Sequence, residues 1–237
     1  MITATTTDRA VHGTRYGIAQ YRYPLSFVLA GKTLSLTGAD ARTAQMEFTD
    51  RERMTFTRDG QAEVSVYECL PVAEDVYLVS FEVAARFAVV DLARGRVLLI
   101  EVDADTETAY AIDGVAQPDQ IGIALTDEMT GTAVRWTLGD GRNLSFEYLS
   151  DHESRQSWSP RPDRVHTLPT RYYSLGEGLF VVIAKTAAPP GIDLPQGLNR
   201  LVMVQDFAKV VLGGAALSVV FNERVLFSGY GTFLDAS

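Results

Sequence analysis

The chain contains the stretch Gly31-Lys-Thr-Leu-Ser-Leu-Thr37, and a hundred residues later it contains the similar stretch Gly131-Thr-Ala-Val-Arg-Trp-Thr137. Three more pairs of segments follow in the same order with a similar apolar pattern. They are Met46–Phe48 with Phe146–Tyr148, Asp75–Phe81 with Gly178–Ala184, and Val89–Leu92 with Val204–Phe207. This period is far longer than that of a solenoid repeat, so it predicts one small β unit that is present twice.

Short alternating or β-branched segments fill both halves, with turn residues between them, which is typical of an antiparallel sandwich or barrel. In the first half we expect strands at 33–37, 44–49, 53–57, 64–70, 76–83, 87–92, 96–102 and 108–112. So many short strands in so few residues predict a closed barrel for one half alone.

The second half is expected to repeat this unit with two insertions. We expect strands at 133–136, 144–148, 171–175, 179–186, 201–207, 210–212, 217–221 and 225–228. The insertions are Ser159–Pro169 and Ala187–Asn199, and both contain prolines. They are predicted to be loops at a barrel mouth, where binding residues tend to gather.

The prediction is therefore an all-β chain of two tandem antiparallel β-barrels formed by an internal duplication. Residues 1–30 form an N-terminal arm, 31–115 the first barrel, 116–130 a linker and 131–237 the second barrel.

Composition limits the classes of function. The net charge of −9 argues against binding to a nucleic-acid backbone. A single cysteine, Cys69, excludes an internal disulfide, which fits a cytoplasmic protein. We expect no membrane partner, because no unbroken apolar run approaches the ~20 residues that a spanning helix needs.

Alternate residues of a strand share one face, so the pattern also predicts what lines each barrel. In the first half this set contains Tyr77, Val79, Phe81 and Val83, and in the second it contains Trp136, Leu144, Phe146, Tyr148, Phe180, Val182 and Ala184. Such a lumen suits a hydrophobic or aromatic small molecule, although the same side chains could simply fill a small barrel. Leu179, Val181 and Ile183 lie on the opposite face, which predicts contact with the first half or with a second copy in a homodimer.

Chemistry is predicted to reside in the second half. The three histidines, His12, His152 and His166, lack metal-ligand spacing, so we expect neither a metal nor another cofactor. The predicted catalytic residues are His166, Tyr172 and Tyr148, and the predicted ligand-binding residues are Trp136, Phe146, Trp158, Arg171 and Phe180. Alternatively, each of these residues has only a structural role, either as a side chain of the hydrophobic core or as a solvent-exposed side chain.

The duplicated pattern resembles two lipocalin-like (calycin-type) families, molybdenum cofactor biosynthesis protein F and the phenolic acid decarboxylases. The resemblance is carried by Gly31-Lys32, the Asp140-Gly141 turn, Phe146-Glu147-Tyr148 leading to Asp151-His152, Asp75–Phe81, and the apolar run closed by Asp91. The tandem arrangement is more similar to the cofactor-biosynthesis family, and it implies that both barrels are lipocalin-like.

Where the decarboxylases have a tyrosine pair on their first strand, this chain has Leu36-Thr-Gly38 and Trp136-Thr-Leu138. Their glutamate position corresponds to Val83 and Thr186. Both halves lack the groups of that reaction, so the resemblance does not imply phenolic acid decarboxylation.

Three hypotheses remain open at this stage. The first is a biosynthetic lyase, isomerase or cyclase that needs no cofactor and binds a hydrophobic or aromatic small molecule in a barrel lumen. The second is a non-catalytic carrier or accessory protein linked to molybdenum cofactor assembly. The third is a structural dimer module with filled barrels. An enzyme predicts an ionisable group with a shifted pKa in the pocket, whereas a carrier predicts a pocket without one.

Overall fold

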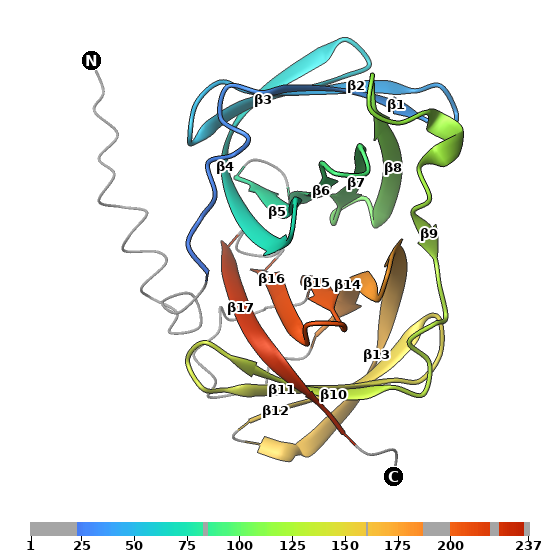
Figure 1. Ribbon diagram of the computed structural model, residues 1–237. Helices are drawn as coiled ribbons and strands as arrows, with labels where there is room; N and C mark the ends of the chain where they lie inside the picture. The colour runs from blue at the N-terminus through green and yellow to red at the C-terminus, as the bar shows by residue number, and fades with distance from the viewer. Residues whose placement is uncertain (1–22, 83–84, 160, 187–199, 219–222, 235–237) are drawn as a thin grey trace, which may run out of the picture.

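Two β-barrels lie side by side in the computed structural model (Figure 1). The structure describes residues 23–82, 85–159, 161–186, 200–218 and 223–234, so most of the predicted N-terminal arm and the predicted insertion 187–199 lie outside the described residues. Within the described residues, the one helical element is the 3-10 turn η1 (Pro118–Gln120) between the barrels. The all-β prediction is confirmed.

The first barrel is an up-and-down meander in which each strand pairs with the next and the last pairs with the first. Its strands are β1 (Thr33–Gly38), β2 (Thr43–Phe48), β3 (Arg53–Arg58), β4 (Gln61–Ala73), β5 (Val76–Phe81), β6 (Arg86–Asp91), β7 (Arg96–Glu101) and β8 (Thr106–Ile112). All eight predicted strands of this half are confirmed, with shifts of a few residues at their ends.

The second barrel has the same topology, closed by pairing between its third and fourth strands. Its strands are β10 (Ala133–Leu138), β11 (Asn143–Tyr148), β12 (Glu153–Trp158), β13 (Arg161–Gly176), β14 (Leu179–Lys185), β15 (Arg200–Asp206), β16 (Val211–Ser218) and β17 (Glu223–Phe233). A short strand from the linker, β9 (Ala124–Leu125), adds to β13 outside the closed ring.

Two local predictions in the second half are wrong. Segment 159–169 is not a loop, because Arg161–Pro169 forms the first part of β13 and pairs with β12, a strand that the sequence pattern missed. Pro169 interrupts the pattern where β13 changes partner from β12 to β14, a point at which a missing N–H is tolerated.

Strand β16 was expected as two short strands on either side of Gly213-Gly214, but it is continuous. A Cβ at Gly213 would lie 2.3 Å from Val72 Cγ1 of the first barrel, and one at Gly214 would lie 2.7 Å from Phe227 Cζ in the lumen. These glycines allow close packing on both faces of one strand and do not mark a turn.

The duplication is visible in the strand register. Asp91 pairs with Val76 and Arg96, and Asp206 pairs with Leu179 and Val211 at the same place in the second barrel. The strand pairing is equivalent in the two barrels, so inward-facing residues of one barrel can be matched to those of the other, except in β13 beside Trp158, where the register shifts.

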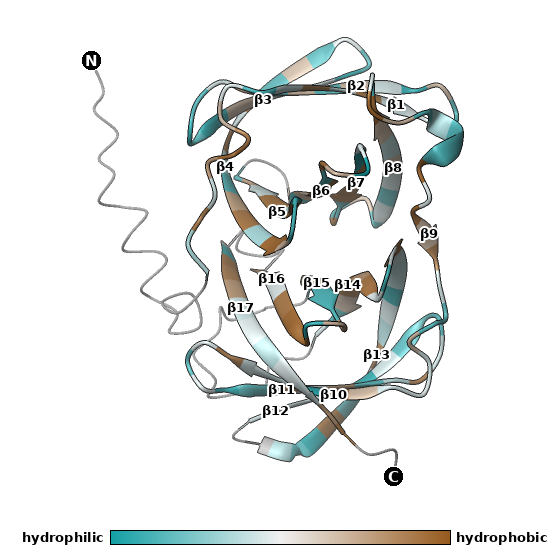
Figure 2. Cartoon of the chain, in the orientation of Figure 1, coloured by the Kyte–Doolittle hydropathy of each residue, from teal (hydrophilic) through white to brown (hydrophobic). Residues whose placement is uncertain are grey.

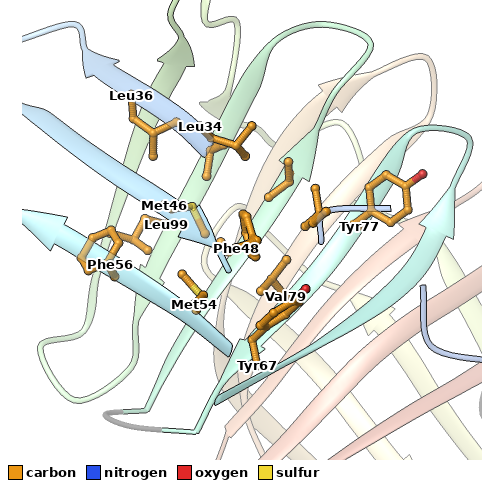
Figure 3. Close-up of a cluster of buried hydrophobic side chains, with 14 of the residues drawn as sticks. Leu34, Leu36, Met46, Phe48, Met54, Phe56, Tyr67, Tyr77, Val79 and Leu99 are labelled. Carbon is orange, nitrogen blue, oxygen red and sulfur yellow. The ribbon is translucent and has the colours of Figure 1, made fainter. Parts of the chain in front are cut away.

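The apolar side chains form three clusters, one in each lumen and one between the barrels. Figure 2 shows hydrophobic residues on the strands where the barrels face each other, and Figure 3 shows the side chains that fill the first lumen. Leu179, Val181 and Ile183 lie in the cluster between the barrels, so the surface that covers them is the first half of the same chain. A homodimer stays a prediction.

A buried ion pair adds to this contact. Arg96 Nε donates to Asp91 Oδ2 at 2.9 Å, and neither side chain is more than 6% exposed. The same guanidinium donates to the carbonyl oxygens of Ile121 and Gly122 in the linker and of Leu175 in β13. Arg96 therefore ties together the first barrel, the linker and the second barrel.

Candidate functional site

The lumen of the second barrel is the candidate site. Six of the eight predicted site residues lie in its apolar cluster, and none is more than 4% exposed. They are Trp136, Phe146, Tyr148, Trp158, Tyr172 and Phe180. Alternation along the strands placed Trp136, Phe146, Tyr148 and Phe180 correctly on the inner face, whereas it did not place Trp158 or Tyr172 there.

Phe207 closes one end of this lumen from the turn between β15 and β16. Its ring centroid lies 5.4 Å from that of Phe180, and 6.1 Å from those of Trp136 and Tyr148. Phe233 contacts it edge-on at 5.6 Å. Phe207 was not predicted as a site residue, although it matches Leu92, which packs against the first lumen.

A buried polar pair lies within this aromatic wall. The Tyr148 hydroxyl donates to Gln205 Oε1 at 2.5 Å. Burial raises the pKa of Tyr148 well above its ordinary value, and the hydrogen bond to Gln205 only partly opposes this shift. Tyr148 is therefore a neutral phenol at physiological pH.

A second polar group lies on β12 and β13. Ser154 Oγ and Thr170 Oγ1 are 2.6 Å apart, and Gln156 Nε2 donates to Ser154 Oγ at 3.0 Å. Tyr172 donates its hydroxyl proton to the carbonyl oxygen of Glu153 at 2.9 Å, and burial raises its pKa to about 12. This phenol is also neutral at physiological pH.

Several buried polar atoms of the second barrel have no hydrogen-bond partner among the described residues. They are Trp136 Nε1, Trp158 Nε1, Gln156 Oε1 and Thr186 Oγ1. The first barrel has three such atoms, Glu63 Oε1, Ser80 Oγ and Tyr110 OH. An unpaired buried polar atom costs about 1–3 kcal/mol, so each of these positions favours a partner such as water or a ligand.

The other two predicted site residues lie elsewhere. His166 is half-buried on β13 and pairs in register with Gln156, so its side chain is on the inner face of the strand. Arg171 is on the outer face, where its Nη2 lies 2.7 Å from both Asp105 Oδ1 and Glu107 Oε1 of the first barrel. Arg171 therefore connects the barrels, and it lines a cleft of about 260 Å³ outside the lumen with Lys185.

Comparison with known families identifies the first half of the chain. The family model of the MoaF N-terminal domain matches residues 11–104. This part of the chain is similar to the MoaF N-terminal domain. No curated protein matches it. The matched segment ends before β8, so the family match covers most of the first barrel and none of the candidate site in the second.

The first barrel, which contains most of the matched segment, is crossed at one end by an ion-pair network. Arg58 Nη1 lies 2.6 Å from Glu101 Oε2, and Arg86 Nη2 lies 3.2 Å from Glu101 Oε1. Arg86 Nη1 also lies 3.1 Å from Glu63 Oε2. Since β3 and β7 are opposite each other in the eight-stranded ring, the pair between Arg58 and Glu101 spans the lumen.

Aromatic rings lie directly beneath this network. The Arg86 guanidinium carbon is 4.8 Å from the Phe56 ring centroid and 5.9 Å from that of Phe81, and the two rings are 6.0 Å apart. Cations and rings at these distances attract one another. This end of the first MoaF-like barrel is therefore closed by four charged side chains and two rings.

The second barrel has none of these groups at the equivalent positions. Register places Trp158, His166, Leu201 and Ala216 where the first barrel has Arg58, Glu63, Arg86 and Glu101. It places Gln156 at the position of Phe56 and Ala184 at that of Phe81. The two barrels thus share a topology and differ in how this end of the lumen is lined.

Two general findings bear on the function of the chain. Among the described residues, no group of three or more His, Cys, Asp or Glu side chains is arranged to hold a metal ion. No helix in the described part of the chain is long and apolar enough to cross a membrane.

Proposed function

We propose that this protein binds a small, flat and mainly apolar molecule in the lumen of its second barrel. The main support for this proposal is that the two barrels differ in the side chains that line one end of the lumen. Charged side chains cross the first lumen there, whereas Trp158, Leu201 and Ala216 occupy the equivalent positions in the second. The MoaF domain and the barrel fold are compatible with small-molecule binding.

The side chains beneath this end support the same proposal. Where the first barrel has the ring of Phe81, the second barrel has Ala184, which has no ring. Where the first barrel has the ring of Phe56, the second barrel has the amide of Gln156. The remaining wall is aromatic, and ring faces favour stacking with a flat ligand.

Binding without turnover is the function that this lumen supports best. Tyr148 and Tyr172 do have shifted pKa values, but both shifts are upward and away from neutral pH, so these phenols stay protonated, donate hydrogen bonds and do not act as bases. Such a protein would carry its ligand or present it to a partner, and a role near molybdenum cofactor assembly is one form of that proposal.

Catalysis as a lyase, isomerase or cyclase is the second candidate, and the position of His166 favours it. His166 faces the lumen side of β13 beside Gln156, and imidazole is the usual general base near neutral pH. An enzyme predicts that the mass or absorbance spectrum of a bound ligand changes with time. The variant His166→Gln should then abolish that change and retain binding.

The two tryptophans of the chain both lie in this lumen, so they report on it selectively. We would label the protein with [15N]tryptophan, assign the two indole N–H signals with Trp136→Phe and Trp158→Phe, and titrate a neutral naphthalene derivative. Binding inside the second barrel should shift at least one indole signal in a saturable way. Unchanged signals together with calorimetric evidence of binding would place the ligand elsewhere and refute the proposal.

A matched pair of variants separates the two barrels. Ala184→Phe introduces the residue that the first barrel has at Phe81, and Ala44→Leu introduces the residue that the second barrel has at Leu144. Each adds bulk to one lumen. Ala184→Phe should weaken binding at least ~10-fold, as expected when a close-packed space is filled. Ala44→Leu should leave binding unchanged.

A further inference from the structure

The orientation of the Gln156 side chain is fixed by its neighbours. Gln156 Nε2 donates to Ser154 Oγ and to the backbone carbonyl oxygen of Lys185, both at 3.0 Å. A carbonyl oxygen only accepts hydrogen bonds, so the amide nitrogen must face Lys185. The amide oxygen, Oε1, is then left as a buried acceptor without a partner among the described residues.

Two further groups at the same end of the barrel complete a set of hydrogen-bonding atoms. Trp158 is two residues from Gln156 on the same face of β12, which places the two side chains side by side. Its Nε1–H is an unpaired donor, and its side chain is 1% exposed. Thr186 follows β14 in the alternation of Val182 and Ala184, and its buried hydroxyl also lacks a described partner.

Among the described residues, the one ionisable side chain beside this set is that of His166, which is half-buried and pairs in register with Gln156. The buried charged side chains in the described part of the chain are Asp91 and Arg96 of the first barrel and Asp206 of the second. Asp206 is on the outer face of β15, which it shares with Val202 and Val204 of the cluster between the barrels. A charged ligand group would therefore be buried with no fully buried counter-charge among the described residues, and only the half-buried His166 imidazole would lie beside it, which makes its burial costly.

We propose that Gln156, Trp158 and Thr186 bind the polar end of the ligand, and that this end is an uncharged group that both donates and accepts a hydrogen bond. A primary carboxamide or a lactam has this chemistry, because its N–H can donate to Gln156 Oε1 and its carbonyl oxygen can accept from Trp158 Nε1. A carboxylate cannot donate, and it carries a charge. This inference rests on the proposed function and specifies the substrate class of the same site.

Three probes of nearly equal shape separate these chemistries. Naphthalene-2-carboxamide donates and accepts, naphthalene-2-carboxylate only accepts and is charged, and 2-methylnaphthalene does neither. Calorimetry on the full chain should show the carboxamide binding at least ~10-fold more tightly than the other two, because only it satisfies the buried atoms. The Trp158 indole proton should move downfield with the carboxamide and not with the methyl compound.

Variants assign the preference to residues. Trp158→Phe and Gln156→Met should bring carboxamide affinity down to that of 2-methylnaphthalene and keep the binding of 2-methylnaphthalene itself. Gln205→Leu is the matched control, because it removes a glutamine amide near Tyr148 at the far end of the same lumen. It should retain the preference for the carboxamide.

The outcomes distinguish this inference from the proposed function. Equal affinity for the three probes, or tightest binding of the carboxylate, would overturn the inference and leave the proposed function standing. A failure of all three probes to bind would overturn both. The wild-type series decides between these outcomes even if one variant does not fold.

Discussion

Replacing Arg96 is predicted to weaken the attachment of the two barrels to each other. Its guanidinium binds Asp91 of the first barrel, the carbonyl oxygens of Ile121 and Gly122 in the linker, and the carbonyl oxygen of Leu175 in the second barrel. Arg96→Val removes all of these bonds at once. It also reproduces the second barrel, where Val211 holds the equivalent position beside Asp206.

The magnitude follows from the burial of this ion pair. Removing one partner of a buried pair typically costs about 3–5 kcal/mol, because the other charge stays buried. Asp91 retains its bond from the Arg94 backbone N–H at 3.0 Å and an ion pair with the Arg94 side chain at 3.6 Å, which reduces the loss. Three carbonyl oxygens lose a donor, at about 1 kcal/mol each. We expect Arg96→Val to lower the free energy of unfolding by about 4 kcal/mol.

Urea unfolding measures this change with two probes. Tryptophan fluorescence follows the second barrel and circular dichroism follows both, so separate transitions in the variant would show that the barrels have become uncoupled. The control is Arg94→Ala, which removes the ion pairs of a partly exposed side chain with Glu177 and, at 3.6 Å, with Asp91; because Asp91 keeps its bond from Arg96, the control should cost less than about 1 kcal/mol. A loss for Arg96→Val no larger than that of the control would refute the reasoning.

Three more predictions concern ionisable groups. Burial raises the pKa values of Tyr67 and Tyr172 to about 12, so the folded state keeps phenol protons that the unfolded state loses near pH 10. The free energy of unfolding should therefore fall between pH 10 and pH 12, and the tyrosinate absorbance of these two residues should appear at a higher pH in the folded protein than in the unfolded chain. Burial tends to raise the pKa of Glu101, but its bonds to Arg58 and Arg86 outweigh burial and lower this pKa. In acid titrations the wild type should therefore lose stability as the pH falls below about 4.5, and Glu101→Gln should lose less stability over the same range. Burial raises the pKa of Cys69 to about 12, so a thiol reagent at pH 8 should modify it only at the rate of unfolding, and rapid modification of the folded protein would contradict its buried position.

The fold was largely predictable because the alternation of apolar residues is a local signal. The match between Val89–Leu92 and Val204–Phe207 located equivalent strands, and alternation along β14 correctly placed Phe180, Val182 and Ala184 in the lumen. The pattern failed at β12, whose inward residues Ser154 and Gln156 are polar, so the strand shows no hydrophobic alternation. Those polar residues are buried because they bond to each other and to Thr170 and Lys185, which only the folded barrel brings together.

The candidate site was predictable only in part, for a similar reason. Side-chain type suggested that Arg171 binds a ligand, but its position on the outer face of β13 pairs it with Asp105 and Glu107. Gln156 and Thr186 were not predicted as site residues, because an isolated glutamine or threonine in a sequence gives no sign that its hydrogen bonds are unpaired. The network that closes the first barrel joins residues from four strands, and no local pattern indicates it.

A crystal structure of the protein with naphthalene-2-carboxamide tests the central claim most directly. The naphthalene ring should lie within the second barrel, and the carboxamide should lie within hydrogen-bond distance of Gln156 Oε1 and Trp158 Nε1. The ion pair between Arg58 and Glu101 in the first barrel should be intact. A ligand seated in the first barrel, or bound only in the outer cleft beside Arg171, would contradict it.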